Sequence, residues 1–373
     1  MKILVTGAQG FIGKNLIAVL STREDIEILA FDLDTPMEKL DEFCRKCDFV
    51  YNLAGVNRPQ NMKEFVEGNT EFAAVLVDTL KKNGNTCPVM NSSSIQAVLE
   101  NPYGTSKKEG EEKILAYGRE TGVPVYIYRF PNVFGKWCRP NYNSAVATFC
   151  HNIAHDLPVQ VNDRSTVMHL VYIDDVVEEL LLALEGHPHV KSDGYCYVPV
   201  EYTTTLGEIV DLIYSFKESR QNFMVPDMSN NSFSKKLYSA YLSYLPEEDF
   251  SYPLVMHEDE RGSFTEILKS ADRGQVSVNI SKPGITKGNH WHHSKNEKFV
   301  VVSGRGRVCF RKYGGEKVIE YPVSGEKIKV IDIPTGYTHS IINDGDTDLI
   351  TLMWCNECFD PNNPDTMYEP VLR

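Results

Sequence analysis

The chain has 373 residues, of which 42% are hydrophobic and 24% charged, and its formal net charge is −13. This length predicts two or three domains with ordinary cores, and the acidic charge argues against a nucleic-acid or anionic-membrane partner. The N-terminus lacks a signal-peptide pattern, and no apolar stretch reaches the roughly 18 residues of a membrane span. The nine cysteines are an odd number. We therefore expect a cytoplasmic protein with reduced thiols.

The first half of the chain alternates short apolar segments with segments of helical periodicity. The strand-like segments are residues 2–7, 26–32, 48–55, 88–93 and 123–130, and the helical ones are 13–20, 63–82 and 106–119. Strands that alternate with helices indicate a parallel sheet with crossover helices. We predict an α/β domain with a Rossmann-type, doubly wound parallel sheet.

The pattern changes near residues 245–254, after which short β-like runs dominate. These runs are residues 274–281, 298–304, 306–312, 326–334 and 348–354, and turns rich in Gly, Asp and Asn separate them. This pattern is typical of an all-β sandwich or barrel. We place the two domains at residues 1–248 and 249–373.

Three glycines follow the first predicted strand and precede the first predicted helix. Gly7, Gly10 and Gly13 form G-x-x-G-x-x-G, which lets the backbone approach a pyrophosphate at a helix N-terminus. Asp32 ends the second strand, where an acid accepts hydrogen bonds from the adenosine ribose and repels a 2′-phosphate. A tight turn without a ligand, and an ordinary loop acid at Asp32, are the alternatives.

Tyr103 and Lys107 lie four residues apart at the start of a predicted helix and so share one face. The lysine can lower the tyrosine pKa and bind the nicotinamide ribose, while the tyrosine donates a proton to a carbonyl oxygen that receives hydride. The serines at 92–94 follow a buried strand and can supply a hydroxyl to the same oxygen. Ser94 is our choice, with Ser93 as the alternative.

These motifs resemble the extended short-chain dehydrogenase/reductase family over residues 1 to about 240. The matching stretches are TGAQGFIG (6–13), NLAG (52–55), SSS (92–94), YGTSK (103–107), RFPNVFG (129–135) and YIDDV (172–176). The resemblance implies a catalytic set of Ser94, Tyr103 and Lys107, and substrate contacts from Arg129 and Asn132, because R-x-x-N-V-F-G is typical of nucleotide-sugar members. It implies a cofactor site formed by Gly7, Gly10, Phe11, Ile12, Gly13, Asp32, Leu53, Ala54, Gly55, Tyr103 and Lys107.

Four side chains in the second domain suit a divalent transition metal. His290 and His292 are two apart and face the same way on a strand, and Glu297 and His339 add a carboxylate and a third imidazole. We predict zinc, with another divalent metal as the alternative. The pairs Cys44/Cys47 and Cys355/Cys358 are less convincing zinc or redox candidates, and we interpret His187 and His189 as a surface loop.

The segments 284–304 and 334–343 resemble the two cupin motifs, which implies a jelly-roll barrel. In the second motif Gly325 precedes Pro334 by more residues than usual. DERGSFTE (259–266) and the stretch 275–290 resemble deoxysugar-nucleotide epimerases. That resemblance implies substrate contacts from Arg261 and Glu266, and a role for Lys287 in stabilising an enolate. It also assigns the proton-abstracting base to the position of His290, which we instead interpret as a ligand.

Both domains in this order resemble the CapF-type family of bifunctional capsular-polysaccharide enzymes. The resemblance implies a homodimer that acts on a UDP-2-acetamido-2,6-dideoxy-4-ketohexose. The cupin would epimerise C3, and the reductase would reduce the C4 ketone to UDP-2-acetamido-2,6-dideoxy-L-talose, the precursor of UDP-N-acetyl-L-fucosamine. The resemblance to this family favours NADPH as the cofactor, whereas the carboxylate of Asp32 favours NADH. Two alternatives stay open: a single-site reductase or 4-epimerase with a structural cupin, and a nucleotide-sugar-binding regulator.

Overall fold

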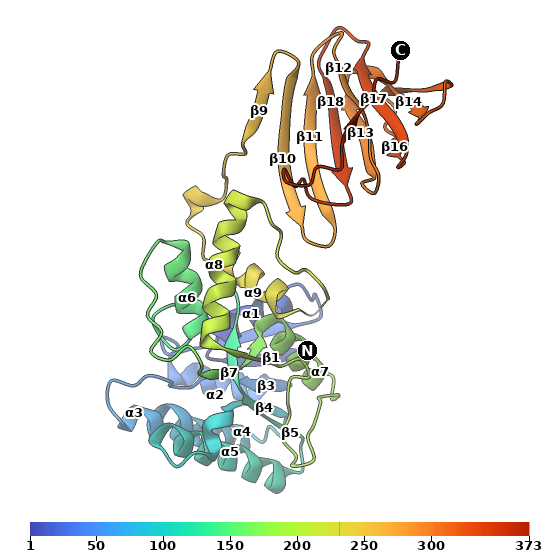
Figure 1. The fold of residues 1–373 in the computed structure, drawn as a ribbon. Coiled ribbons are helices and arrows are strands. Elements are labelled where there is room, and N and C mark those ends of the chain that lie inside the picture. The colour runs from blue at the N-terminus through green and yellow to red at the C-terminus, as the bar shows by residue number, and fades with distance from the viewer. Residues whose placement is uncertain (231, 373) are drawn as a thin grey trace. The chain divides into compact units, whose positions relative to one another are not determined.

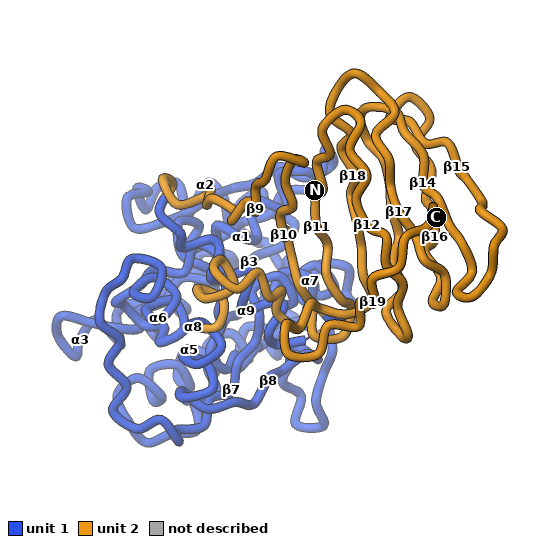
Figure 2. Tube along the Cα trace, turned by 45° about the horizontal axis from the view of Figure 1, so that its top comes forward, with its two compact units in different colours: residues 1–214, 229–246 blue, residues 215–228, 247–373 orange. Residues whose placement is uncertain are grey.

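A computed structural model describes residues 1–230 and 232–372, and these fall into two compact units. Unit 1 comprises residues 1–214 and 229–246, and unit 2 comprises residues 215–228 and 247–373 (blue and orange in Figure 2). The division therefore falls within helix α8 (Leu206–Asn222). The division into domains at residues 1–248 and 249–373 stays a prediction.

Unit 1 contains a five-stranded sheet in the order β2-β1-β3-β4-β5, in which every pair is parallel. Its strands are β1 (Lys2–Thr6), β2 (Glu27–Phe31), β3 (Phe49–Asn52), β4 (Val89–Ser94) and β5 (Val125–Phe130). The strand order reverses between β1 and β3, and in such sheets ligands bind at the carboxyl ends of the strands near this switch.

Helices cover both faces of this sheet (Figure 1). One core cluster packs the apolar faces of α2, α4 and α5 against the sheet, while α1 contacts α7. These helices are α1 (Phe11–Leu20), α2 (Met37–Lys46), α4 (Phe72–Lys82), α5 (Pro102–Thr121) and α7 (Ile173–Leu184). The predicted helix over residues 63–82 is interrupted, because Val66–Glu71 forms a π-helical segment between α3 (Lys63–Phe65) and α4.

The remaining elements of unit 1 form a small mixed sheet and three helices. They are β6 (Asn132–Phe134), β7 (Val167–Tyr172), β8 (Tyr202–Thr205), α6 (Ala145–Ala154), the first part of α8, and α9 (Phe233–Leu242). Together with the 3₁₀ segment Ile95–Val98 they complete the elements described for this unit.

Unit 2 consists of two sheets that share one apolar core. The strand orders are β16-β13-β18-β11-β10-β9 and β15-β14-β17-β12-β19, all antiparallel. Strands β9–β14 are Met256–Asp259, Gly262–Ser270, Gly274–Ser281, Thr286–Trp291, Glu297–Ser303 and Arg305–Lys312, and β15–β19 are Val318–Ser324, Val330–Ile333, Tyr337–Asn343, Leu349–Cys355 and Met367–Tyr368. Side chains such as Phe299, Val308 and Ile341 fill the space between the sheets.

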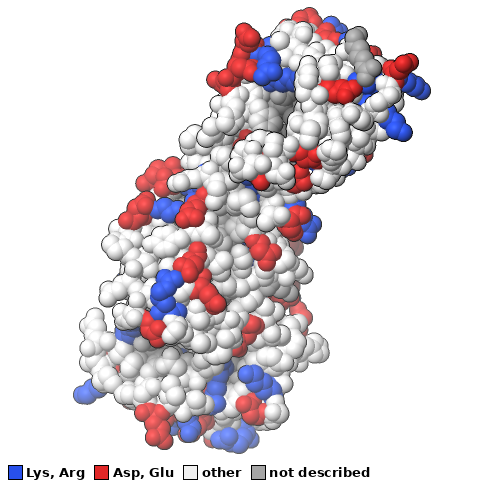
Figure 3. All heavy atoms as spheres, viewed as in Figure 1, with Lys and Arg blue, Asp and Glu red and all other residues white. Residues whose placement is uncertain are grey.

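One part of unit 2 was not foreseen from the sequence. Residues 215–228 belong to this unit, where Val225 donates its N–H to the carbonyl of Lys269 in β10, and Lys269 donates to Phe223. Otherwise the predicted fold class is confirmed: a Rossmann-type parallel sheet precedes an all-β unit of two antiparallel sheets. Among the described residues, no helix has the length and apolar character needed to cross a membrane. On the face shown in Figure 3, acidic and basic side chains are interspersed.

Candidate functional site

The glycine-rich turn between β1 and α1 brings three segments of backbone into close contact. Gly7 has a φ of +64°, and a Cβ on it would lie 2.7 Å from the amide nitrogen of Ala54. A Cβ on Gly13 would lie 2.2 Å from the carbonyl oxygen of Gly7. Only glycine fits at these two positions. The helix starts after Gly10 without a side-chain cap, so the amides of its first turn face outward and suit a diphosphate.

Asp32 lies at the end of β2 and holds the glycine-rich turn. One of its carboxylate oxygens accepts the N–H of Gln9 at 2.7 Å, and the other accepts the N–H of Leu33 at 2.8 Å. The side chain of Gln9 in turn donates to Asp34. Asp32 is therefore next to the predicted cofactor site, but both of its oxygens already have a partner.

Tyr103 and Lys107 lie on α5, on the face of the helix that packs against the sheet. The hydroxyl of Tyr103 donates to Oδ1 of Asn57 at 3.0 Å and is in contact with Ser94. Ser93 points elsewhere, because its hydroxyl donates to the buried Glu111. The structure therefore brings Ser94, Tyr103 and Lys107 together, as the sequence predicted. Their catalytic roles stay predictions.

Lys107 is a buried cation with few acceptors. The residue is 9% exposed, and its Nζ donates to the carbonyl of Ser92 at 3.3 Å. A Cβ on Gly55 would lie 2.8 Å from this Nζ, so the glycine makes room for it. Burial lowers the pKa of Lys107 to about 8, and the charge of Glu111 opposes this effect. The amine stays protonated at neutral pH and can stabilise developing negative charge on Tyr103.

Asn69 connects this site to the loop after β3, and the sequence alone did not single it out. It lies in the π-helical segment, and its amide both accepts the N–H of Val56 at 3.0 Å and donates to the carbonyl of Val56 at 3.1 Å. It also donates to the hydroxyl of Ser106. This clamp fixes the loop that carries Gly55 and Asn57. A break in helical geometry often marks a functional site, but the sequence pattern gave no signal for it.

Arg129 and Asn132 do not approach Tyr103 through any described contact. The guanidinium of Arg129 forms an ion pair with Glu111, with distances of 2.9 and 2.6 Å, and lies over the ring of Tyr195. Asn132 donates to the carbonyl of His169. The partner Glu111 lies four residues after Lys107, so same-face spacing could have identified it. Substrate binding by Arg129 and Asn132 stays a prediction.

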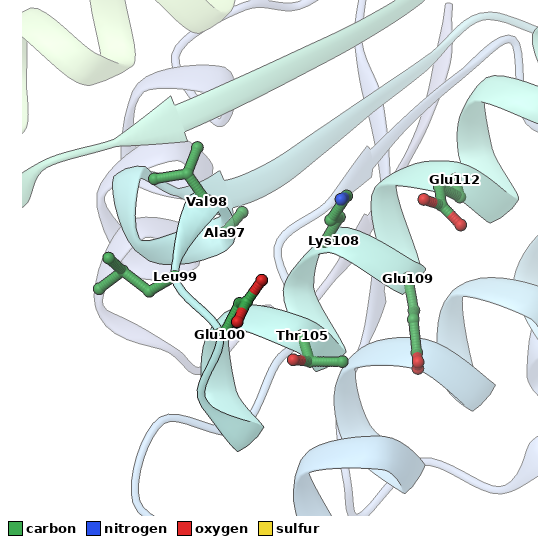
Figure 4. A pocket seen from close by; sticks show the side chains of 8 residues that line it. All are labelled: Ala97, Val98, Leu99, Glu100, Thr105, Lys108, Glu109 and Glu112. Atoms are coloured by element: carbon green, nitrogen blue, oxygen red, sulfur yellow. The ribbon is translucent and has the colours of Figure 1, made fainter.

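A pocket of about 350 Å³ lies elsewhere on α5 (Figure 4). It is lined by Ala97, Val98, Leu99, Glu100, Thr105, Lys108, Glu109 and Glu112. At 100° per residue, the α5 residues of this set lie on the face opposite to Tyr103 and Lys107. The pocket is therefore separate from the predicted catalytic residues.

In unit 2, the four predicted metal ligands meet between the two sheets. One ligand atom from each of His290, His292, Glu297 and His339 lies within 4.8 Å of the others. Oε2 of Glu297 is 3.5 Å from Nε2 of His292 and 3.2 Å from Nε2 of His339. These three atoms are buried and have no hydrogen-bond partner. Orphaned buried polar atoms are costly, so three imidazoles and a carboxylate around one point fit a divalent metal.

A β-bulge in β12 aligns these ligands. The pairing of β12 with β17 skips Asn289, which has a φ of +60°. The skipped residue shifts the alternation of side chains, so Lys287 and His290 both reach the facing sheet although they are three apart. Burial, and after it the neighbouring imidazoles of His339 and His292, lower the pKa of His290 to about 3, so its imidazole stays neutral and can bind a metal.

Lys287 lies inside unit 2, but its ammonium group is already engaged. It donates to Oδ1 of Asn279 at 2.9 Å, to the carbonyl of Ile280 at 2.7 Å and to the carbonyl of Ser263 at 3.3 Å. An ammonium group has three N–H donors. Lys287 would therefore have to exchange one of these acceptors to stabilise an enolate, and its catalytic role stays a prediction.

The other two predicted substrate residues of unit 2 have different surroundings. Arg261 forms an exposed ion pair with Asp259 at 2.6 Å, and both charges influence Lys287. Glu266 pairs with Lys269 at 2.8 Å. The structure therefore groups Arg261 with Lys287, and describes no contact that would bring Glu266 to them.

The cysteine pairs do not join the metal cluster described above. Cys47 lies 3.7 Å from the buried Cys87, sulfur to sulfur. Cys355 is adjacent to the cluster, because its thiol donates to Oε1 of Glu297 at 3.1 Å. This contact leaves Oε2 directed at the histidines. The sequence gave no signal for it, since the contact depends on the pairing of β13 with β18. His187 and His189 are exposed and lie in a loop, as expected, and His189 donates its backbone N–H to the buried Glu179.

Comparison with known proteins gives matches over both units. Residues 3–194 match the NAD dependent epimerase/dehydratase family, and residues 257–367 match the polysaccharide biosynthesis C-terminal domain. The chain is 45% identical over 366 residues to UDP-2-acetamido-2,6-beta-L-arabino-hexul-4-ose reductase of Pseudomonas aeruginosa, and the match covers 98% of each protein.

Solved structures agree with these matches. The chain is similar to the capsular polysaccharide assembling protein CapF from Staphylococcus aureus, with 55% identity, a TM-score of 0.94 and full coverage of both chains. It is also similar to UDP-glucuronic acid 4-epimerase from Bacillus cereus in complex with NAD, with 20% identity and a TM-score of 0.53 over 65% of this chain and 96% of the other. The second similarity concerns the fold alone.

The pKa of Lys107 can be measured directly. In the free protein we expect its amine to titrate near pH 8, because burial disfavours the charged form. NMR of ¹³Cε-labelled lysines will follow the titration, and Lys107→Arg will assign the signal. The neighbouring exposed Lys108 serves as the internal control. A Lys107 midpoint that coincides with that of Lys108 would contradict the assigned environment.

The metal content of the protein tests the cluster in unit 2. We expect about one divalent metal per chain in the wild type and almost none in the double variant His290→Ala/His339→Ala, because only two ligands remain. Elemental analysis of the purified proteins gives the stoichiometry. His293→Ala, which removes an exposed imidazole outside the cluster, is the matched control. Unchanged metal content in the double variant would show that the metal lies elsewhere.

Proposed function

The chain belongs to the NAD dependent epimerase/dehydratase family and is of the CapF type, and we propose that it converts a UDP-linked keto-deoxy amino sugar in two steps. Unit 2 epimerises C3 of a UDP-2-acetamido-2,6-dideoxy-4-ketohexose, and unit 1 reduces the C4 ketone with NAD(P)H. The product is UDP-2-acetamido-2,6-dideoxy-L-talose, the precursor of UDP-N-acetyl-L-fucosamine in capsule or O-antigen synthesis. The reductase name of the Pseudomonas aeruginosa relative supports this substrate class.

The observation that carries the reduction is the contact of Tyr103 with Ser94, next to the buried Lys107. A nicotinamide held at the glycine-rich turn would supply a hydride to C4; as the C4–O double bond becomes a single bond, the oxygen takes the proton of the Tyr103 hydroxyl. Ser94 donates a hydrogen bond to the same oxygen. The Lys107 ammonium stabilises the tyrosinate until solvent reprotonates it.

The tyrosine hydroxyl has to leave Asn57 before it can act. In the structure it donates to Asn57, and the substrate oxygen takes the place of that acceptor when the ketone binds. Burial raises the pKa of Tyr103, and contact with Ser94 opposes the rise. The phenol is therefore protonated before hydride transfer, as a proton donor has to be.

The metal cluster supports the epimerisation. Removal of the C3 proton gives an enediolate whose charge rests on the C4 oxygen, and return of a proton to the other face of C3 inverts that centre without any net oxidation. His290, His292, Glu297 and His339 would hold a divalent metal, which would supply an electrophile for that oxygen. We also assign to Lys287 the stabilisation of the negative charge on the C4 oxygen. For this, its ammonium group has to exchange one of its three hydrogen-bond acceptors for that oxygen.

For the cofactor we propose NADPH. Asp32 opposes this proposal, because a carboxylate repels a 2′-phosphate. However, both oxygens of Asp32 accept backbone N–H groups, and these bonds partly neutralise the charge and commit the side chain to holding the glycine-rich turn. We therefore give Asp32 less weight than the similarity over the whole chain.

A second candidate function has one active site: unit 1 acts as a reductase or 4-epimerase and unit 2 has a structural or dimerising role. The committed hydrogen bonds of Lys287 favour this alternative. The two candidates differ in one observable property, which is exchange of the C3 proton with solvent in the absence of a nicotinamide.

The two chemistries can be separated with Tyr103→Phe. We expect this variant to oxidise NAD(P)H about 100- to 10,000-fold more slowly with the keto-sugar, because it lacks the proton donor. It should still exchange the C3 proton in deuterated buffer, as the wild type does without nicotinamide. NMR of the sugar follows the exchange, and the exposed Tyr214→Phe is the matched control.

Two results would contradict the two-site proposal. The first is exchange that requires NADPH, and the second is exchange that persists in His290→Ala/His339→Ala. Absence of any exchange in the wild type would favour the single-site alternative. A near-normal rate of NAD(P)H oxidation by Tyr103→Phe would refute the catalytic role of the tyrosine.

Cofactor choice is tested by kcat/KM for NADPH and NADH. We expect the higher value for NADPH, and a further relative gain for NADPH in Asp32→Asn, because the amide keeps an acceptor for the turn backbone but no longer repels the 2′-phosphate. Asp34→Asn, which loses only contacts with the Gln9 side chain, is the control. A clear NADH preference in the wild type would show that Asp32 selects the cofactor.

A further inference from the structure

Residues near the C-terminus run along β12, the strand that carries His290 and ends one residue before His292. Residues 365–371, which we call the tail, lie beside β12, where His290 pairs with Tyr368 and Trp291 pairs with Met367. The tail is more than 70 residues away in sequence from His292, yet it contacts the segment between His292 and Glu297. Neither the metal ligands nor the predicted catalytic residues lie in the tail.

Asp365 organises the turn that joins two of the ligands. Only four residues separate His292 from Glu297, and the backbone N–H groups of the first three, His293, Ser294 and Lys295, donate to the Asp365 carboxylate at 2.8, 2.7 and 2.9 Å. Three converging N–H donors on one carboxylate form a strong, charge-assisted arrangement. The side chain therefore fixes the path of the chain from the histidine to the glutamate.

The main chain of the same residue orients the His292 ring. The carbonyl of Asp365 contacts Nδ1 of His292, so Nδ1 carries the proton in the neutral ring. Nε2 is then an acceptor without a proton, and it is the buried nitrogen that faces Glu297. Histidine ligands in metal sites commonly donate their second N–H in this way, which sets both the tautomer and the ring orientation.

The rest of the tail is firmly anchored, so Asp365 is held in place. The carbonyl and the side chain of Asn289, the residue at the bulge, accept the N–H groups of Glu369 and Val371. The buried Arg311 donates to the side chain of Glu369 and to the carbonyls of Pro370 and Val371. The tail thus connects the bulge that aligns His290 with the turn that follows His292.

We propose that Asp365 is a positioning residue for the metal site, which holds the His292–Glu297 turn and the His292 tautomer in the geometry that binds the ion. The inference rests on the proposed metal site. Partners of metal ligands typically change metal affinity by about 10- to 100-fold when they are replaced. Removal of the Asp365 side chain leaves three backbone donors without their acceptor, and the turn can then move away from the ligand geometry.

The test uses the full-length protein, stripped of metal with a chelator and titrated with Co²⁺. Affinity comes from competition with a chromophoric chelator, and the visible absorption of bound Co²⁺ reports the ligand geometry. We expect Asp365→Ala to bind Co²⁺ about 10- to 100-fold more weakly than the wild type, with a changed spectrum. Asp365→Asn keeps one oxygen acceptor and should show a smaller loss.

The control is Asp360→Ala, which removes an exposed carboxylate from the same end of the chain. Its described contacts stay within its own turn, so it should bind Co²⁺ like the wild type. Wild-type affinity and spectrum in Asp365→Ala would overturn the inference. If Asp365→Ala does not fold, unchanged binding by the folded Asp365→Asn would overturn it equally. A wild-type protein that binds no Co²⁺ would refute the metal site itself, which is a separate failure.

Discussion

The chemistry of unit 1 depends on the burial of one cation. Lys107 lies between the carbonyl of Ser92 and the backbone of Gly55, and a side chain at position 55 would collide with it. Glu111 is the nearby charge that opposes the loss of its proton, and Arg129 in turn neutralises Glu111. A buried ion pair costs desolvation unless its geometry is good. The network of Glu111, Arg129 and Ser93 therefore supports the buried cation, and it engages two of the three guanidinium nitrogens of Arg129.

In unit 2, the candidate metal site depends on strand register, because its four ligands come from both sheets. Regular alternation along β12 cannot bring Lys287 and His290 to the same side. The bulge at Asn289 does so, and the tail stabilises the bulge through both the carbonyl and the side chain of that residue. The thiol of Cys355 then orients Glu297 through Oε1, and the carbonyl of Asp365 orients His292 through Nδ1. The ligand geometry thus depends on strand register as much as on the ligands.

Sequence patterns predicted the parts of this protein that depend on local spacing. The glycine-rich turn, the shared face of Tyr103 and Lys107, and the His290–His292 pair all follow from periodicities of a few residues, and the structure brings each set together. The patterns missed what depends on distant pairing. Asn69 reaches Val56 across a helix and a loop, Phe223 and Val225 join a strand of unit 2, and Asp365 meets a turn some 70 residues earlier. No local pattern in the sequence encodes such contacts.

The order of the two proposed reactions follows from the chemistry of the ketone. The C3 proton is acidic only while C4 is a carbonyl, because the negative charge left at C3 is stabilised by delocalisation onto the C4 oxygen. Reduction by the Tyr103 site makes C4 tetrahedral and removes that acceptor, so no arrangement of ligands around the metal can then epimerise C3. Epimerisation therefore comes first, and reduction makes it irreversible. Because the two proposed sites belong to one chain, they are always present in equal number.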